Sequence, residues 1–483
     1  MDRIEPPADL TRVSTGVHEL DIVMGGGVPE HSTTVLAGDP GTGKTILAMQ
    51  MLFQQARAGK RCIYFTTLSE PSLKIIRYMR LFGFFDEDLV GRSVSFVDLG
   101  TVLMSEGGMG AVAAIEARLE SVQPDFVVID SFKAIHDVIE SGPAGSRRVA
   151  YEISVLLAAW GATTLLLGEY TERERAGLPE FAIADGIIQV WNQPYGLTRL
   201  RALEIEKLRG VEYIPGRHFF EISDSGLTFY PRLRGVRGQS SEVWTPAKVP
   251  TGLTGLDELL RGGLPSGSTT LLEGGTGSGK SSLAMKFLVE GARRGEPGLH
   301  FGLEERPVQL RGVTLGFGWD LADFEARGLL RLQYTSPVEL NADQFVAEAI
   351  GAIRSTRARR VVFDSSTSLA LGLEIGGRYR ELIYALATHL REEGITAIIT
   401  AETPRLFGNT QLTGAAVSSI VDNVILLRYV EVDNRLEHAI SVLKVRGFEH
   451  GTELRRMTFG SDGPTVGPPF TGLQGVLTGS PHD

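Results

Sequence analysis

The sequence predicts an α/β fold made of two tandem domains, each with a mostly parallel β-sheet flanked by helices. Three observations support this prediction. Continuous apolar segments of strand length alternate with helix-like segments, which is typical of a parallel sheet covered on both faces. A glycine-rich loop between such a strand and such a helix occurs twice. A constant number of residues separates the two loops and the landmarks that precede them.

The second copy of the loop, Gly274–Ser281, reads GGTGSGKS and lies between a predicted strand, Thr269–Leu272, and a predicted helix, Ser282–Ala292. Its spacing is that of a phosphate-binding loop, in which glycines let backbone N–H groups face an anion. Lys280 is placed to reach the terminal phosphates, and the Ser281 hydroxyl to bind Mg²⁺. A simple glycine-rich turn before a helix would not require the Lys-Ser ending.

The first copy of the loop, Gly38–Thr45, reads GDPGTGKT and separates a predicted strand, Thr33–Ala37, from a predicted helix, Ile46–Ala58. Lys44 and Lys280 are 236 residues apart (280 − 44). The same offset separates three further pairs: Thr15 and Thr251, Asp21 and Asp257, Pro29 and Pro265. A constant offset indicates tandem duplication, so we expect two related nucleotide sites.

The residues that we expect to bind nucleotide follow from the two loops. They are Gly38, Asp39, Pro40, Gly41, Thr42, Gly43, Lys44 and Thr45 in the first unit, and Gly274, Gly275, Thr276, Gly277, Ser278, Gly279, Lys280, Ser281 and Ser282 in the second. Thr45 and Ser281 are the expected Mg²⁺ ligands.

A short apolar strand that ends in aspartate follows each loop and helix. The strands are Phe126–Asp130 (FVVID) and Val361–Asp364 (VVFD). This is where the acid that organises Mg²⁺ belongs in a nucleotide-hydrolysing enzyme. An isolated aspartate here would more simply cap the next helix, but the same order occurs twice. Later predicted strands are each followed by an acid that either senses phosphate or merely ends the strand: Glu169 after Thr163–Leu167, and Glu402 after Thr396–Thr400.

Two basic segments also correspond between the units, one containing Lys207 and Arg209, the other Lys444 and Arg446. Cations two residues apart on a strand share one face of the sheet. A solvated strand face is the simpler interpretation. The alternative is that these four side chains reach the phosphates bound by a neighbouring subunit, as arginine fingers do.

Bulk composition restricts the function classes. The chain has 483 residues, a net charge of −10 and one cysteine, Cys62. The net negative charge argues against a protein whose main surface binds nucleic acid. A single cysteine excludes an internal disulfide framework. No apolar run reaches the length of a membrane span, and Met1–Leu10 does not resemble a signal peptide. We therefore expect a cytoplasmic protein in which Cys62 is buried.

The repeat sets the expected domain limits. We predict a first domain over residues 1–235, a second over residues 236–459, and an extended C-terminal arm over residues 460–483. The stretch Pro231–Pro250 is basic and contains Ser and Gly, which is typical of a linker.

These residues together resemble a known family. Each unit has a TG-x-x-x-LD phrase, a GG-x-P turn, a phosphate-binding loop, a strand-end aspartate and a K-x-RG segment. The doubled frame, with the stretch from Ser418 to Gly447, resembles the KaiC family of double RecA-type P-loop ATPases and autokinases from the bacterial circadian clock. The resemblance covers Arg12 to Phe470. It implies two RecA-like domains, ATP with Mg²⁺, and a homohexamer with nucleotide at subunit interfaces. Signalling partners, KaiB-like proteins among them, are also implied.

Family roles can be carried onto matching positions of the second unit. The paired catalytic glutamates fall on Glu304 and Glu305. The phosphorylated hydroxyls fall on Ser418 and Ser419, with a third on Thr413. A carboxylate such as Glu304 can accept the proton of an attacking hydroxyl. Without the resemblance, serines before an apolar strand would be assigned as turn formers. The resemblance thus implies a serine autokinase, with Lys44, Lys280, Asp130 and Asp364 completing the two catalytic sets.

Three features depart from the family pattern. Ser419 stands where the clock protein has threonine. In the first unit Leu68 and Ser69 replace the glutamate pair, and Glu70 follows one residue later. A shift of one residue at a strand end reverses the direction of a side chain, which leaves hydrolysis by the first unit open. The tail after Phe470 does not resemble the partner-binding tail of the clock protein.

Two other functions are compatible with the sequence. A motor on single-stranded DNA would need basic channel loops, and residues 141–148 (SGPAGSRR) and 376–380 (GGRYR) are the candidates. The acidic total charge and the lack of an aromatic stacking series argue against it. A hexameric scaffold gated by nucleotide is the other alternative.

Overall fold

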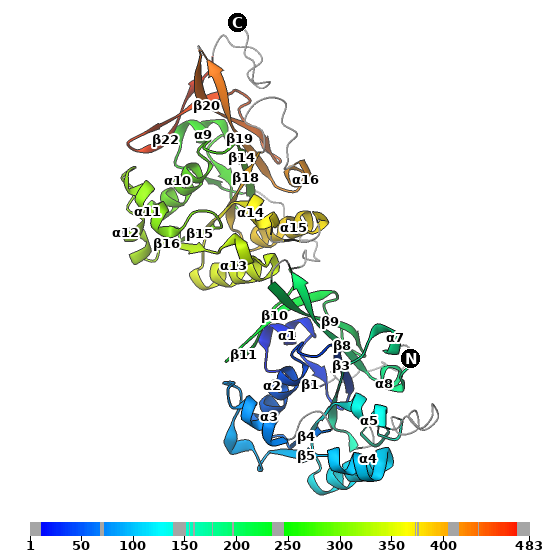
Figure 1. The fold of residues 1–483 in the computed structure, drawn as a ribbon. Coiled ribbons are helices and arrows are strands. Elements are labelled where there is room, and N and C mark those ends of the chain that lie inside the picture. Colours follow the sequence, from blue (N-terminus) through cyan, green and yellow to red (C-terminus); the bar gives the residue numbers. More distant parts are fainter. Residues whose placement is uncertain are drawn as a thin grey trace, which may run out of the picture. The chain divides into compact units, whose positions relative to one another are not determined.

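The computed structural model describes residues 11–67, 72–138, 151–153, 155–157, 160–175, 177–195, 198–233, 246–371, 373, 376–403, 415–432 and 434–470. The chain divides into two compact units, residues 1–232 and 233–483. Each unit contains one nine-stranded sheet and one two-stranded sheet (Figure 1). The predicted fold class is confirmed.

The elements of the first unit follow the predicted alternation. They are β1 (Arg12–Val13), α1 (His18–Val23), β2 (Val28–Pro29), β3 (Thr33–Gly38), α2 (Lys44–Arg57), β4 (Cys62–Thr66), α3 (Ser72–Met79), η1 (Glu87–Leu89), β5 (Val94–Asp98), α4 (Gly100–Val122), β6 (Phe126–Asp130), α5 (Phe132–Val138), β7 (Thr163–Gly168), α7 (Glu172–Arg175), α8 (Pro179–Ile183), β8 (Gly186–Tyr195), β9 (Thr198–Leu208), β10 (Arg217–Ser223) and β11 (Gly226–Tyr230).

The second unit repeats this order. Its elements are β12 (Lys248–Val249), α9 (Thr254–Leu259), β13 (Leu264–Pro265), β14 (Thr269–Gly274), α10 (Lys280–Arg293), β15 (Gly298–Gly302), α11 (Pro307–Leu315), α12 (Leu321–Ala326), β16 (Leu330–Tyr334), η2 (Pro337–Glu339), α13 (Ala342–Thr356), β17 (Arg360–Asp364), α14 (Ser366–Leu371), α15 (Gly376–Glu392), β18 (Thr396–Glu402), α16 (Ala415–Ser418), β19 (Asn423–Val432), β20 (Arg435–Val445), β21 (Arg455–Gly460) and β22 (Gly463–Pro469).

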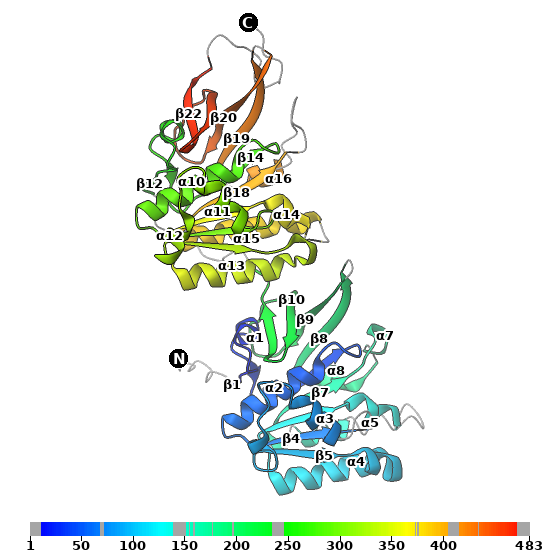
Figure 2. The same ribbon diagram turned by 60° about the vertical axis from the view of Figure 1, so that its left-hand side comes forward.

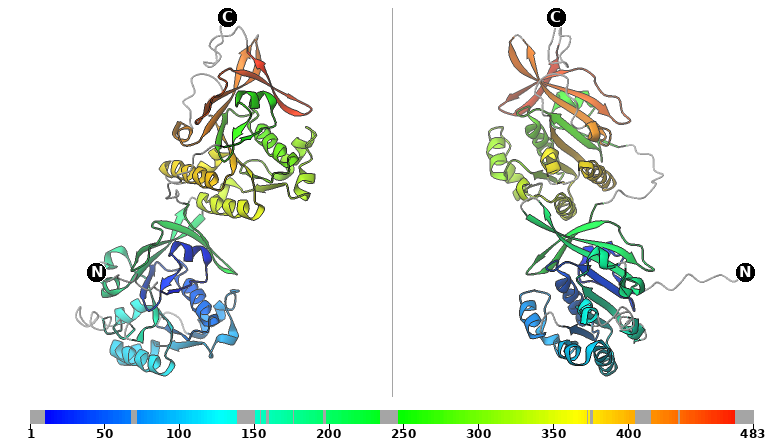
Figure 3. Two further views of the ribbon diagram at one scale, coloured as in Figure 1. Left: turned by 180° about the vertical axis from the view of Figure 1, so that it is seen from behind. Right: turned by 45° about the vertical axis from the view of Figure 1, so that its right-hand side comes forward.

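The two large sheets have the same topology. Their strand orders are β11-β10-β9-β8-β3-β7-β6-β4-β5 and β16-β15-β17-β18-β14-β19-β20-β21-β22. Pairing is parallel from β8 to β5 and from β19 to β16, and antiparallel in the remaining three strands of each sheet. The antiparallel strands gather at one side of each unit (Figure 3). In both units the strand that carries the glycine-rich loop is central.

Alternation along the strands explains why helices cover both faces of the sheet. On β6, Phe126 and Val128 belong to one apolar cluster, whereas Val127 and Ile129 belong to the other. Helix α2 packs into the first cluster and α4 into the second, and the helices accordingly lie on opposite faces (Figure 2). Burial on both faces requires continuous apolar strands, as the sequence predicts.

Three expected segments differ from the structure. Gly463–Pro469 does not belong to an extended arm, because it pairs with β21 as the edge strand of the second sheet. The end of the expected linker, Lys248–Val249, pairs with β13. The predicted channel loop over residues 376–380 is the start of helix α15, and Arg378 donates to Asp343 at 2.6 Å. Residues 141–148 and 471–483 lie outside the described residues. No helix in the described part of the chain is both long and apolar enough to cross a bilayer.

One buried cation, Arg360, joins several segments of the second unit at the start of strand β17. The Arg360 side chain is 1% exposed, and its Nε donates to Glu296 at 2.6 Å. Its Nη1 donates to the carbonyl oxygens of Pro250 and Phe287 at 2.8 and 3.0 Å. The guanidinium also lies 4.8 Å from the centre of the Phe287 ring. Arg360 thus joins the entry of the unit, helix α10 and strand β17.

We expect Arg360→Met to lower the free energy of unfolding of the second unit by about 3 kcal/mol, because two buried carbonyls and one carboxylate lose their donor. The urea midpoint of unfolding measures this loss. Arg354→Met is the matched control: its pair with Glu393 is largely exposed, so it should cost less than about 0.5 kcal/mol. Equal shifts for the two variants would contradict the role of Arg360.

Cys62 is buried at the start of β4, as the sequence predicts. Burial raises the pKa of its thiol to about 12, and the charge of Asp125 adds to the effect. Because the folded pKa exceeds the value of 9.0 for an ordinary thiol, the stability that Cys62 contributes is present below that pH and is lost as the pH rises toward the folded value.

At pH 8 a thiol reagent such as DTNB should react with Cys62 only after urea is added, because the folded protein buries this thiol. Rapid reaction of the native protein would show that this description of Cys62 is wrong.

Candidate functional site

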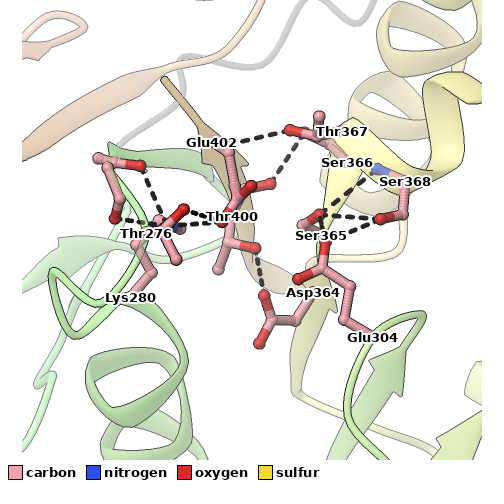
Figure 4. A network of polar contacts seen from close by, with 12 residues as sticks. Thr276, Lys280, Glu304, Asp364, Ser365, Ser366, Thr367, Ser368, Thr400 and Glu402 are labelled. Carbon is pink, nitrogen blue, oxygen red and sulfur yellow. Dashed lines mark hydrogen bonds and ion pairs between the residues drawn. The ribbon is translucent and has the colours of Figure 1, made fainter. Parts of the chain in front are cut away.

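The glycine-rich loop of the second unit surrounds its own lysine. Helix α10 begins at Lys280, inside the loop motif, and the preceding Gly279 has a φ of 94°. Lys280 is 7% exposed, and its Nζ donates to the carbonyl oxygens of Gly274 and Gly275, both at 3.0 Å. The carboxylate of Glu402 lies 3.6 Å from the same Nζ. The ammonium group is therefore held where the strand ends and the helix begins (Figure 4).

Asp364 lies at the end of β17 and is 7% exposed. Its Oδ1 accepts a hydrogen bond from Thr400 at 2.5 Å, and its Oδ2 is 3.9 Å from His300 Nε2. Burial by itself raises the pKa of Asp364, but His300, Thr400 and Ser281 outweigh it, so the pKa lies below its ordinary value. Asp364 therefore stays ionised beside Ser281, an arrangement of hard oxygen atoms that fits Mg²⁺.

The predicted glutamate pair follows β15 and faces the strand-end aspartate. Glu304 Oε1 accepts hydrogen bonds from Ser365 and, at 2.7 Å, from Ser368 (Figure 4). Burial raises the pKa of Glu305, and the charges of Asp364 and Glu304 add to the effect against that of His300. The two serines fix one oxygen of Glu304, whereas the second oxygen makes no hydrogen bond among the contacts of the described residues.

The first unit places its loop lysine in the same way. Lys44 Nζ donates to the carbonyl oxygens of Gly38 and Asp39 at 2.8 and 2.9 Å. Burial lowers the pKa of Lys44, and the charges of Glu169, Asp130 and Asp39 oppose this effect. A cavity of about 700 Å³ opens beside this lysine. Its lining includes three cations and two acids: Lys44, Lys133, Arg201, Asp130 and Glu169.

Asp130 is held by two hydroxyl groups. Thr45 Oγ1 and Tyr64 Oη donate to its Oδ2 at 2.8 and 2.6 Å. Tyr64 occupies the position of His300 in the second unit, at the loop offset of 236 residues (300 − 64). The Thr45–Asp130 contact shows that a loop hydroxyl and the strand-end acid meet, as Mg²⁺ binding requires. Within the described residues, no group of three or more His, Cys, Asp or Glu side chains could hold a metal by itself.

The four basic residues of the K-x-RG segments contact their own chain. Lys207 donates to the carbonyl of Ala184 at 2.6 Å, and Arg209 to Asp185 at 3.2 Å. In the second unit Lys444 Nζ donates to the carbonyls of Ser418 (2.9 Å) and Val421 (2.7 Å). Arg446 donates to the carbonyl of Ser419 at 3.0 Å and lies 3.7 Å from Asp422, the counterpart of Asp185. Burial lowers the pKa of both lysines, and the neighbouring arginine lowers it further. Each pair thus fixes the turn before an antiparallel hairpin.

Some predicted residues lie outside the described part of the chain, namely Leu68, Ser69, Glu70 and Thr413. Conversely, the sequence did not single out several residues that line the sites: Tyr64, His300, Ser365, Ser368, Lys133 and Arg201. The duplicated frame held a signal for some of them, because Tyr64 and His300 lie at equivalent places. Ser365 and Ser368 follow Asp364 directly, but nothing in the sequence shows that they point at Glu304.

Comparison with known proteins gives matches over nearly the whole chain. A family model described as "ATPase: KaiC" matches residues 13–234 and 249–469. Among similar proteins, the circadian clock oscillator protein KaiC of Rippkaea orientalis is 29% identical over 481 residues, which is 97% of this chain and 91% of the relative. The circadian clock protein KaiC3 of a Synechocystis species is 30% identical over 487 residues, which is 98% of this chain and 95% of the relative.

Strand β21 leaves no room for a side chain at Gly279 of the second glycine-rich loop. A Cβ atom at Gly279 would lie 2.3 Å from the Phe459 ring, and alanine also pays about 1–2 kcal/mol for a positive φ. We expect Gly279→Ala to lower the thermal midpoint, and Phe459→Ala added to it to restore only the part due to the clash. Gly43→Ala, which meets the mobile end of Ile222 at 2.7 Å, should cost less. No rescue by Phe459→Ala would exclude the clash.

Proposed function

The chain belongs to the KaiC family of ATPases, and on that premise we propose that its second unit is a serine autokinase that acts in a circadian clock or a related signalling system. The proposal includes ATP binding at both loops with Mg²⁺. The observation that carries it is the hydroxyl-bound Glu304, whose partners Ser365 and Ser368 follow Asp364 directly in the chain.

Each residue has a role in this proposal. Lys280 and the loop amides bind the terminal phosphates, and Ser281 with Asp364 would hold Mg²⁺, which neutralises phosphate charge when bound. Glu304 accepts the proton of the attacking serine hydroxyl. The serine oxygen forms a bond to the terminal phosphorus, the bond to the bridging oxygen breaks, and ADP leaves. Water in place of serine gives hydrolysis.

Ser418 and Ser419 are the proposed acceptors, on the adjacent protomer of a homohexamer. Ser418 ends helix α16 and is half-buried, and Ser419 in the following turn is exposed. Exposure of Ser419 supports its use by a neighbouring subunit. Lys207, Arg209, Lys444 and Arg446 remain proposed contacts to a neighbour's phosphates, which would require them to leave the turns that they bind here.

The first unit is proposed to bind ATP, without a commitment to hydrolysis, because Leu68 and Ser69 replace the glutamate pair. The structure weakens the alternative that the chain binds single-stranded DNA. One candidate channel loop is the start of α15, where Arg378 is paired with Asp343. The proposed place of action is the cytoplasm, with signalling proteins as partners.

Glu304→Gln tests the catalytic assignment. We expect it to preserve ATP binding and to lower phosphoserine at positions 418 and 419 by about a hundredfold or more, because an amide cannot accept the proton. Phosphopeptide mass spectrometry after incubation with Mg²⁺ and ATP measures the product. Lys280→Ala should remove both binding at this site and phosphate. Glu393→Gln, an exposed acid in the turn that follows α15, is the matched control and should change neither. Undiminished phosphoserine in the Glu304 variant would overturn the assignment, and ATP consumption without phosphoserine in the unmodified protein would leave an ATPase.

A further inference from the structure

Lys133 is a cation of the first site that neither loop motif contains. It lies in α5, directly after the strand-end Asp130, and lines the cavity of about 700 Å³ together with Lys44 and Thr45. Its position beside Asp130 puts it at the end of the cavity where the terminal phosphate and Mg²⁺ belong in this class of site.

One partner of Lys133, the carboxylate of Glu174, can release it. Lys133 Nζ lies 3.4 Å from Glu174 Oε1, and the two side chains are 20% and 43% exposed. The other oxygen of Glu174 already accepts hydrogen bonds from the backbone N and the hydroxyl of Thr171, both at 2.8 Å. These two bonds are the main reason why the pKa of Glu174 is lowered, and Lys133 contributes least. Glu174 therefore stays satisfied when the lysine moves toward an anion.

The second unit has no cation at this place. The strand-end aspartates are 234 residues apart (364 − 130), and the same offset relates Lys133 to Thr367. Thr367 lies in α14, and its Oγ1 accepts a hydrogen bond from the backbone N of Glu402 at 2.9 Å. At this position after the strand-end acid, the first unit therefore carries an ammonium group where the second carries a neutral hydroxyl.

We propose that Lys133 is a second phosphate-binding cation of the first site, which contacts the terminal phosphate of ATP and makes this site prefer the triphosphate over the diphosphate. The proposal rests on ATP binding by the first unit. An ammonium on a flexible four-carbon stem can reach an anion that a threonine cannot. ADP lacks the terminal phosphate, so it gains little from the contact. The first site is thereby suited to retain ATP, whereas the second site, with Thr367, lacks this means of discrimination.

Binding measurements on the full chain test the proposal. Lys280→Ala removes nucleotide binding at the second site. Titration calorimetry with the Mg²⁺ complexes of AMP-PNP and ADP then measures binding at the first site alone. In this background we expect Lys133→Thr, which installs the residue of the second unit, to weaken AMP-PNP by about tenfold or more and ADP by less than about twofold. Lys133→Arg should retain the preference, and Glu174→Gln should leave AMP-PNP binding unchanged or tighter.

The outcomes separate this inference from the proposed function. Equal weakening of both nucleotides by Lys133→Thr, or an unchanged ratio, overturns the role of Lys133 while ATP binding stands. Weakening of AMP-PNP by Glu174→Gln also overturns it, because the ion pair would then be part of the site. Failure of the Lys280→Ala parent to bind either nucleotide overturns both this inference and ATP binding by the first unit.

Discussion

The parallel register of the central strands is the constraint on which both sites depend. Parallel strands end at the same edge of a sheet, so residues that are distant in sequence meet there. In the second unit Gly274 at the end of β14 is paired with Glu402 at the end of β18, and Gly302 at the end of β15 with Asp364 at the end of β17. The loop lysine, the strand-end aspartate and the glutamate pair therefore lie along the same edge of the sheet.

The same frame supports two different chemical environments. Asp130 receives a hydrogen bond from Tyr64, whereas Asp364 has His300 nearby at the equivalent position. The difference extends to the antiparallel strands. Arg201 faces Asn192 across its strand pair and lines the first cavity, and the equivalent pair in the second unit is His438 with Tyr429. Duplication thus preserved the backbone geometry that holds phosphate, and the side chains around it changed.

The sequence predicted the features that depend on neighbouring residues in the chain. The loops, the strand-end aspartates and the alternation of elements follow from spacing and apolar pattern, and β6 begins and ends where FVVID does. Contacts between distant segments could not be predicted. Gly463–Pro469 contains three prolines in a Gly-rich tail, a composition typical of a loop, yet it forms an edge strand because an edge strand tolerates proline. The serines that hold Glu304 are 61 and 64 residues away from it in sequence.

The turn at Ser418 and Ser419 shows how a modification there would act on the fold. Lys444 and Arg446 now donate to the carbonyl oxygens of these two residues. A phosphate group on either serine would bring nearly two negative charges within reach of the same two cations. A charge-assisted bond to phosphate is stronger than a bond to a neutral carbonyl, so the cations would exchange one partner for the other. Because Lys444 lies on β20, that exchange would alter the packing of the hairpin β19–β20. Strand β21 pairs with β20, and its Phe459 lies against Gly279 of the phosphate-binding loop. The proposed acceptor and the loop are therefore connected within one chain through the antiparallel part of the sheet.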